Sequence, residues 1–352
     1  MREMKKVSSS ISFSGLGGKL MELEGLNSLS DINKMAVMGF WEVLKNLRFL
    51  KSVEQNVLNY LKKNPVDAII LIDYPGFNLR IAKKIKKMNP DIPIFYYISP
   101  QVWAWKEGRI NIIKKYIDKM LVLFEFEYIW YKKRGIETEF VGHPFLDIYQ
   151  SNNKVSAREK LNLDQNKKCL TLFPGSRKQE VDNHLPYMLQ AIKNPFFNDF
   201  EIFLGQANTL GGEISDFYNL ENIKVIKSDS RIALEAADFA WVGSGTSTLE
   251  AVLLNIPIVL VYKTSWASWR LMKRFVQVKY AGMPNIIMNE LVVPELLQEN
   301  YTVNNLIKET KDFFNNTSHQ KKLFEDYRSI KDRLGRPGAS ARAAKYIINN
   351  VN

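Results

Sequence analysis

Short apolar runs, separated by longer amphipathic stretches, constrain the fold of this chain more than any other feature of its sequence. Each run holds three to five residues, as is typical of strands that are buried on both faces of a sheet. The stretches between them, such as residues 80–88 and 110–119, have the spacing of helices. This alternation predicts an α/β fold with a parallel sheet in each half of the chain. The runs are 68–72, 94–98, 120–124, 169–173, 202–204, 239–242 and 258–262.

The length of 352 residues and the hydrophobic content of 46% allow a large core and predict two domains. Segment 151–168 is polar and poor in strand-forming residues, so we expect it to be the linker. The expected organisation is an N-terminal domain over 1–150, a C-terminal domain over 169–335 and a terminal helix over 336–352. Both domains should be Rossmann-like.

Composition narrows the classes of protein that remain. The net charge of +12 favours anionic partners, and the single cysteine, Cys169, lies in an apolar run, which excludes a disulfide framework. No run reaches the roughly 18–20 apolar residues of a membrane-spanning helix. Residues 1–10 lack the apolar region of a secretion signal, so we expect a cytosolic protein, with peripheral membrane attachment left open. The three histidines, His143, His184 and His319, lack metal-ligand spacing, and we expect no metal.

A strand-to-helix loop in the second half has the composition of an anion site. The run that ends at Phe173 is followed by Pro174, Gly175, Ser176 and Arg177 and then by a helical pattern. Such a loop presents backbone N–H groups, a hydroxyl and a guanidinium at a helix N-terminus, which suits a phosphate or diphosphate. A Pro-Gly turn beside a solvated arginine has the same sequence, so the loop alone leaves both interpretations open.

A second loop of this kind follows in the same half. Gly243, Ser244, Gly245 and Thr246 lead from an apolar run into an apolar helix that contains Glu250. Glycine lets the backbone approach an anion, and the hydroxyls add donors. The loop lacks the Gly-Lys-Ser/Thr of a P-loop and the complete dinucleotide fingerprint. Two such loops in one half favour a nucleotide-sugar site.

Two features of the first half lie just after predicted strands, where ligands of parallel sheets bind. Asp73 follows the run that ends at Ile72, and a partly desolvated carboxylate there suits a general base acting on a sugar hydroxyl. A helix cap or turn ahead of Pro75 explains the same residue equally well. Trp103 and Trp105 follow the next run, where they either stack on a sugar or acyl chain or serve packing.

Residues 35–51 form one further unusual segment. On a helix, its apolar residues share a broad face flanked by Lys45, Arg48 and Lys51. Such a face suits either a membrane interface with anionic lipid or a core helix with a solvated edge. The apolar residues of the face are Val37, Phe40, Trp41, Leu44, Leu47 and Leu50.

Taken together, these segments resemble the lipid-A-disaccharide synthases, bacterial glycosyltransferases, over nearly the whole chain. The tryptophan loop, the Pro-Gly-Ser-Arg loop and a Met-Pro-Asn turn occur in one order that is specific to this family. The segments that carry the resemblance are 13–18, 35–44, 72–73, 97–105, 140–144, 172–180, 243–250 and 283–286.

The resemblance implies a two-domain GT-B fold and an inverting transfer without metal or cofactor. The implied donor is UDP-2,3-diacylglucosamine and the acceptor is 2,3-diacylglucosamine 1-phosphate (lipid X), with a β-1,6-linked disaccharide 1-phosphate and UDP as products. Asp73 would be the base in an acceptor domain over 1–150. The UDP-sugar would bind in the domain over 169–335, through Ser176, Arg177, Gly243, Ser244, Gly245, Thr246, Glu250 and Asn285.

The acyl chains of the implied substrates also indicate where in the cell the protein would act. They favour the membrane interpretation of Val37, Phe40, Trp41, Leu44, Leu47 and Arg48, with the protein attached peripherally to the cytoplasmic face of the inner membrane. A homodimer stays open, because the oligomeric state is not legible from the sequence.

The sequence departs from the family at its start. Family members begin with a strand and a loop of the Gly-Glu-x-Ser-Gly-Asp type, whereas Met1–Lys5 resembles the end of the helix that follows them. We therefore expect an incomplete N-terminal sheet. An inactive remnant of the enzyme is therefore one alternative. Another GT-B enzyme, such as a nucleotide-sugar epimerase, is a second, because it would share the two Gly/Ser loops. A nucleic-acid-binding protein is disfavoured, since the lysines are scattered and no such module is present.

Overall fold

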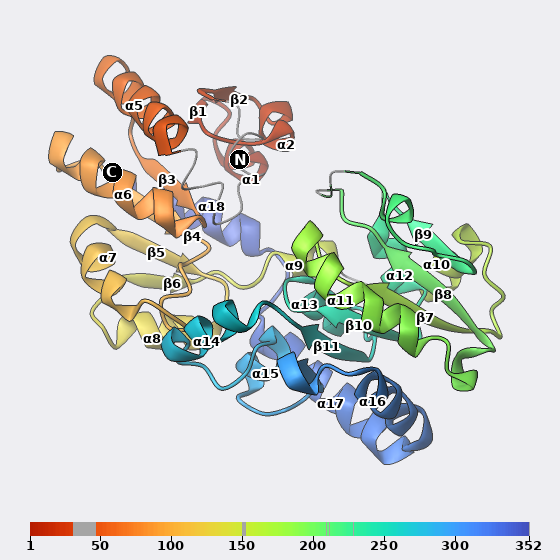
Figure 1. Ribbon diagram of the computed structural model, residues 1–352. Helices are drawn as coiled ribbons and strands as arrows, with labels where there is room; N and C mark the ends of the chain where they lie inside the picture. The colour runs from red at the N-terminus through yellow and green to blue at the C-terminus, as the bar shows by residue number, and fades with distance from the viewer. Residues whose placement is uncertain (31–46, 150–152, 209, 211, 228, 352) are drawn as a thin grey trace. The chain divides into compact units, whose positions relative to one another are not determined.

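The chain forms two compact α/β units. The computed structural model describes residues 1–30, 47–149, 153–208, 210, 212–227 and 229–351. Unit 1 comprises Met1–Pro144 and Gly335–Asn352, and unit 2 comprises Phe145–Leu334. The chain therefore leaves unit 1 once and returns to it after unit 2. Both units are built on parallel strands (Figure 1), which confirms the α/β prediction.

Unit 1 contains a four-stranded sheet in the order β3-β4-β5-β6 and a two-stranded sheet, β1-β2. Its strands are β1 (Phe13–Gly15), β2 (Leu26–Ser28), β3 (Ile69–Ile72), β4 (Ile94–Tyr97), β5 (Lys119–Val122) and β6 (Thr138–Phe140). Its helices are α1 (Arg2–Val7), α2 (Lys19–Leu23), α5 (Leu47–Lys63), α6 (Pro75–Met88), the 3₁₀ helix η1 (Glu107–Arg109), α7 (Ile110–Tyr116), α8 (Glu125–Lys132) and α18 (Ala339–Asn349).

The apolar runs of the first half form β3, β4 and β5. Strands β4 and β5 are largely buried, whereas Ile69 and Ile70 of β3 are half-buried and Ile72 is exposed. Ile94, Phe95 and Tyr96 of β4 have no exposed surface. Helix α6 begins with Pro75, whose fixed φ suits a first helical turn, and it buries one apolar face against the sheet. Since β3 and β4 are parallel and in register, the residues that follow both strands meet at one edge of the sheet.

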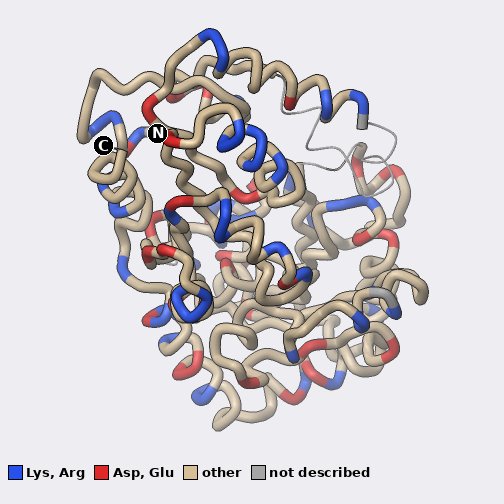
Figure 2. Tube along the Cα trace, turned by 90° about the vertical axis from the view of Figure 1, so that its left-hand side faces the viewer, with Lys and Arg blue, Asp and Glu red and all other residues tan. Residues whose placement is uncertain are grey.

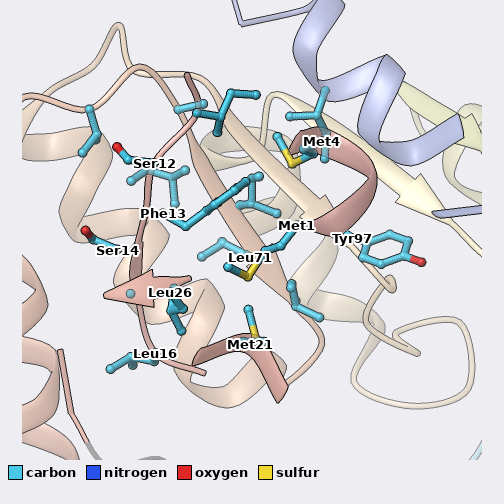
Figure 3. A pocket seen from close by; sticks show the side chains of 18 of the residues that line it. Met1, Met4, Ser12, Phe13, Ser14, Leu16, Met21, Leu26, Leu71 and Tyr97 are labelled. Carbon is cyan, nitrogen blue, oxygen red and sulfur yellow. The ribbon is translucent and has the colours of Figure 1, made fainter. Parts of the chain in front are cut away.

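The two sheets of unit 1 are separated by an apolar pocket of about 1280 Å³. Within the described residues, β1 pairs only with β2 and β3 pairs only with β4, so each strand turns one backbone edge away from its partner. Residues from both strands line the pocket, including Phe13 and Leu71, and Figure 3 shows these side chains together with Met1, Met4 and Leu26 around it. In the described part of unit 1, the two parallel sheets thus stand on either side of one pocket.

Unit 2 contains one parallel sheet in the order β12-β11-β10-β7-β8-β9. Its strands are β7 (Lys168–Phe173), β8 (Phe200–Gly205), β9 (Ile223–Ile226), β10 (Phe239–Gly243), β11 (Ile258–Tyr262) and β12 (Glu295–Leu297). Its α-helices are α9 (Phe145–Ile148), α10 (Lys154–Lys160), α11 (Lys178–Ala191), α12 (Ser230–Glu235), α13 (Ser247–Leu253), α14 (Trp266–Phe275), α15 (Met283–Met288), α16 (Val303–Asn315) and α17 (Thr317–Arg333). The 3₁₀ helices are η2 (Pro195–Phe197), η3 (Ile214–Asp216) and η4 (Gln298–Asn300).

The central strands of this sheet, β7, β10 and β11, are the most apolar and the most completely buried. Trp241 of β10 is fully buried, and its indole N–H donates to the Thr310 hydroxyl at 2.9 Å. Cys169 is buried in β7 as predicted. Because these three strands are neighbours, the loops that follow them lie side by side at their carboxyl ends. Among the described residues, no helix is long and apolar enough to cross a membrane.

Candidate functional site

The candidate residues of unit 1 gather at the carboxyl ends of β3 and β4. Asp73 follows β3 directly, and both Asp73 and Tyr74 adopt left-handed backbone conformations, with φ of 45° and 44°. Non-glycine residues rarely adopt such angles, and where they do, the surrounding structure must hold them. The sequence suggested a partly desolvated carboxylate, but the Asp73 side chain is exposed.

Two buried side chains hold the backbone at Asp73. The Asn78 amide nitrogen donates to the carbonyl oxygens of Ile72 and Asp73, at 3.0 and 2.6 Å, and the Tyr96 hydroxyl donates to the Asp73 carbonyl at 2.5 Å. Burial, followed by the charge of Asp73, raises the pKa of Tyr96, so the phenol stays protonated as a donor. The strained turn is therefore fixed from helix α6 and from strand β4 together.

The tryptophan loop after β4 is fixed on helix α8 by Glu127. One carboxylate oxygen of Glu127 accepts hydrogen bonds from the Ser99 hydroxyl at 2.8 Å and from the Trp103 indole at 2.9 Å. The Tyr131 hydroxyl donates to the Pro100 carbonyl at 2.6 Å. Glu127 is fully buried, and this burial raises the pKa of its carboxyl to about 7.

The two tryptophans therefore differ in what they can contact. Trp103 is buried and packs edge-on against Phe126, with ring centroids 4.9 Å apart, so packing is the interpretation that the structure supports. Trp105 is exposed, and the Lys106 ammonium lies 4.3 Å above its ring. Only Trp105 presents an open aromatic face for a ligand.

The Pro-Gly-Ser-Arg loop of unit 2 follows β7 as predicted, but its amides are not free. The backbone N–H groups of Ser176 and Arg177 donate to one Glu180 oxygen at 2.9 and 3.2 Å, and the Arg177 guanidinium pairs with the other at 2.8 Å. Glu180 thus supplies the acidic half of a capping box at the start of α11, since the arginine side chain has no acceptor for the other half. An anion at this loop would have to displace that carboxylate, whereas the Arg177 side chain is largely exposed and able to reorient.

The glycine loop after β10 lies directly against the first loop. A Cβ atom at Gly243 would stand 3.1 Å from the Pro174 carbonyl oxygen, so glycine permits this close approach. Gly245 and Thr246 are exposed, and Ser244 is partly so, with its hydroxyl donating to the Ala281 carbonyl at 3.2 Å. The structure therefore brings the two predicted loops together.

His184 joins this pair of loops to the end of β11. Its Nδ1 lies within hydrogen-bonding distance of the Pro174 carbonyl, and its Nε2 accepts the Lys263 backbone N–H at 2.9 Å. The ring must be neutral, with the proton on Nδ1, to make both bonds. Burial, the largest effect, lowers its pKa and favours that form. Sequence reasoning considered His184 only as a metal ligand and missed this role.

Glu250 and Asn285 occupy different environments. Glu250, on α13, hydrogen-bonds with Tyr149, and burial raises its pKa. Asn285 is fully buried: its amide nitrogen donates to Val293 and Glu295, and its oxygen accepts two backbone N–H groups. The family resemblance implied that Asn285 contacts the UDP-sugar donor. However, all hydrogen-bonding positions of this side chain are already used within the turn.

The proposed membrane face lies mostly outside the described residues, which exclude Val37, Phe40, Trp41 and Leu44. Leu47 begins α5, and Arg48 is exposed. Leu50, which the sequence placed on the same face, is instead buried in the core of unit 1. Basic residues recur along α5 and α6 (Figure 2), where Arg80 and Lys84 pair with the buried Glu54. No three His, Cys, Asp or Glu side chains among the described residues gather in a way that would hold a metal ion.

Comparison with solved structures shows the fold. The chain matches a glycosyltransferase involved in lipopolysaccharide biosynthesis with a TM-score of 0.54, at 12% identity, over 98% of this chain and 94% of the other. It also matches a kitacinnamycin glycosyltransferase with a TM-score of 0.62, at 11% identity, over 99% and 94% of the two chains. These likenesses, with the two parallel-sheet units, show the GT-B glycosyltransferase fold.

Sequence comparison then identifies the family. The family model described as lipid-A-disaccharide synthetase matches residues 1–348. The lipid-A-disaccharide synthase of Coxiella burnetii is 36% identical over 99% of this chain and 93% of its own length. The chain belongs to this family, and its activity is that of a lipid-A-disaccharide synthase in lipid A biosynthesis. The earlier resemblance is thereby confirmed.

Proposed function

We propose that the chain transfers the sugar of UDP-2,3-diacylglucosamine to the 6-hydroxyl of 2,3-diacylglucosamine 1-phosphate, with Asp73 as the general base. The O6–C1 bond forms while the bond from C1 to the UDP oxygen breaks, and the anomeric configuration inverts. The O6 proton passes to Asp73, and the electron pair of the broken bond leaves with UDP. Family membership and the exposed, backbone-fixed carboxylate of Asp73 support this assignment.

The position of Asp73 is the observation that carries the proposal. General-base catalysis needs a carboxylate that reaches the substrate hydroxyl in a fixed direction. The Asp73 side chain is exposed, while its own carbonyl oxygen is held by Asn78 and Tyr96. The strained turn therefore leaves the carboxylate accessible and restricts where it points.

Unit 2 would bind the UDP part of the donor. The loops at Ser176–Arg177 and Gly243–Thr246 are adjacent, and the Arg177 guanidinium is exposed beside them. We assign charge stabilisation on the departing UDP to this arginine and the Gly243–Thr246 amides, without metal or cofactor. Glu250, on the helix that follows, would grip the ribose hydroxyls. Its half-buried site beside Tyr149 supports a hydrogen-bonding role.

The acylated substrates would place the protein at the cytoplasmic face of the inner membrane, attached peripherally. We retain residues 37–48 as one part of that contact, through Val37, Phe40, Trp41, Leu44, Leu47 and Arg48. A homodimer would be compatible with this placement.

The test is disaccharide formation from the two named substrates in detergent, for the wild type and for Asp73→Asn. Loss of the base should lower turnover by about 10²- to 10⁴-fold while the protein stays folded. Asp67→Asn is the matched control, because Asp67 is an exposed carboxylate just before the other end of β3. If Asp73→Asn keeps full activity, Asp73 is not the base. If the wild type consumes UDP-sugar without forming disaccharide, an epimerase or hydrolase reaction replaces the transferase.

A further inference from the structure

Helix α14, which follows β11 in unit 2, leaves three apolar side chains exposed. Trp266 is 66% exposed, Phe275 is 51% exposed and Met272 is 37% exposed. None of the described side chains of α14 is buried. Helix α16 of the same unit is similarly amphipathic but buries Leu306 and Phe313. An apolar helix face without such cover usually marks a contact site.

The charges of this segment are all of one sign. Residues 263–280 contain five basic residues and no acidic residue, which are Lys263, Arg270, Lys273, Arg274 and Lys279. Within α14, the Arg270 guanidinium lies 5.1 Å from the Trp266 ring and the Lys273 ammonium lies 5.4 Å from the Trp269 ring. Cations beside tryptophan rings on an exposed helix are typical of side chains at a membrane interface.

We propose that α14 is a membrane-docking helix that lies on an anionic lipid bilayer. Trp266, Met272 and Phe275 would enter the boundary between headgroups and acyl chains, and Arg270 and Lys273 would contact lipid phosphates. The inference deepens the proposed function, on which it rests for acylated substrates presented at a bilayer. It adds a contact in unit 2 to the segment around residues 37–48 of unit 1.

Charge decides between a bilayer and a second copy of the chain. A symmetric pair would bring α14 of each copy together and place two groups of three cations, Arg270, Lys273 and Arg274, face to face. An anionic bilayer instead supplies the opposite charge and an apolar layer beneath it. The exposed Trp266 and Phe275 also disfavour nucleic acid, whose phosphate backbone needs cations but no buried apolar anchor.

The test is flotation with phosphatidylcholine vesicles, with and without phosphatidylglycerol. Wild-type protein should float with the anionic vesicles, and more salt should weaken the binding. Trp266→Ser/Phe275→Ser should weaken it about tenfold or more, since two apolar anchors are lost. Arg270→Gln/Lys273→Gln should weaken it by about 25-fold, from about fivefold for each cation near the surface. The matched control, Leu291→Ser/Phe324→Ser, removes two exposed apolar residues elsewhere in unit 2 and should bind as the wild type does.

Two further measurements distinguish a failure of the docking inference from a failure of the proposed reaction. Thermal unfolding checks that the variants fold, and turnover of detergent-dispersed substrates should be equal in wild type and α14 variants. Turnover without flotation, or flotation that does not depend on α14, overturns the docking inference and leaves the proposed reaction standing. Flotation that depends on α14 without turnover overturns the reaction alone. If the wild type is a dimer in vesicle-free buffer that Trp266→Ser/Phe275→Ser dissociates, α14 is a protein interface and the inference is wrong.

Discussion

Asp73 illustrates how two buried neighbours determine the position of one exposed carboxylate. Its left-handed φ costs of order 1–3 kcal/mol, which the hydrogen bonds from Asn78 and Tyr96 to its carbonyl oxygen offset. The side chain itself needs no partner for this geometry to persist. Positioning and chemistry are thus carried by different residues.

Asn78→Ala should therefore lower turnover by about tenfold or more with little change in substrate KM, because the turn relaxes while the binding surfaces remain. Tyr96→Phe, which removes only the hydroxyl, should show a smaller effect in the same direction. The measurement is steady-state kinetics of disaccharide formation. Asn59→Ala, on helix α5, is the control, since the Asn59 side chain bonds only the neighbouring Gln55 in the described contacts. Equal losses in all variants would argue against a positioning role.

The buried carboxyl of Glu127 should make the stability of unit 1 depend on pH. Burial raises the pKa of its carboxyl from 4.5 to about 7, so the folded protein binds this proton more tightly than the unfolded chain does. The contribution of Glu127 to the free energy of unfolding is therefore largest below about pH 4.5. It falls by up to about 3 kcal/mol as the pH rises to about 7. Glu127→Gln should remove this fall. The check is amide hydrogen exchange in β3–β6 between pH 4.5 and 8, corrected for the intrinsic exchange rate, and identical pH profiles would contradict the prediction.

At the scale of elements, the strand-to-helix loops were predictable from the sequence and their internal bonds were not. Apolar runs followed by glycine located the loops after β7 and β10, because runs of this length beside turn residues are typical of buried strands. Glu180 lies three residues after Arg177 and accepts its backbone N–H, but arginine is not a usual N-cap residue, so the sequence did not signal this cap. The hydrogen bond from the Lys263 N–H to His184 could not be predicted either, because it joins residues 79 positions apart.

Gly175 tests whether the first loop needs glycine. It has φ of +139°, and a Cβ atom there would lie 2.4 Å from the Cβ of Glu180. Gly175→Ala should thus destabilise unit 2 by about 1–3 kcal/mol and displace the Glu180 cap. Gly76→Ala in α6 is the control: an added Cβ meets no atom within 4 Å, so stability should stay the same or rise slightly. Thermal unfolding compares the two, and an unchanged midpoint for Gly175→Ala would refute the requirement.

At the scale of the whole molecule, the chain returns to its first unit in a way that its sequence did not reveal. Gly335–Asn352 belong to unit 1, where the Arg342 guanidinium donates to the Val141 carbonyl at 2.9 Å. Composition identifies the terminal helix but not the surface on which it packs. The short strands β1, β2, β6, β9 and β12 were missed for a related reason: they are three or four residues long and partly exposed, so they lack a distinct apolar run.

The pocket of unit 1 offers the last prediction. Ile69 and Asp73 donate their amides to carbonyls of β4 and the residue before it, so the alternation of a strand turns the amides of Ile70 and Ile72 toward the pocket. The Gly15 carbonyl likewise accepts the N–H of Leu29, just after β2, so the backbone of Ser14 faces the pocket from the other side. As far as the described residues show, the pocket thus lies between two open edges of parallel strands. One residue of a strand fills about 3.3 × 4.8 × 10 Å, roughly 160 Å³, so 1280 Å³ is enough for a strand of several residues.

An apolar strand and glycine loop of the family type, fused ahead of Met1, should therefore enter the pocket and pair with both edges. The thermal unfolding midpoint of unit 1 should then rise. The amides of Ile70, Ile72 and Ser14 should exchange hydrogen more slowly, since they gain hydrogen-bond partners inside an apolar environment. A fusion of equal length made only of glycine and serine should change neither quantity. The alternative outcome is equally clear: if both fusions leave the exchange of these three amides unchanged, the space between β1 and β3 does not accept a strand, and the open edges are a stable feature of this fold.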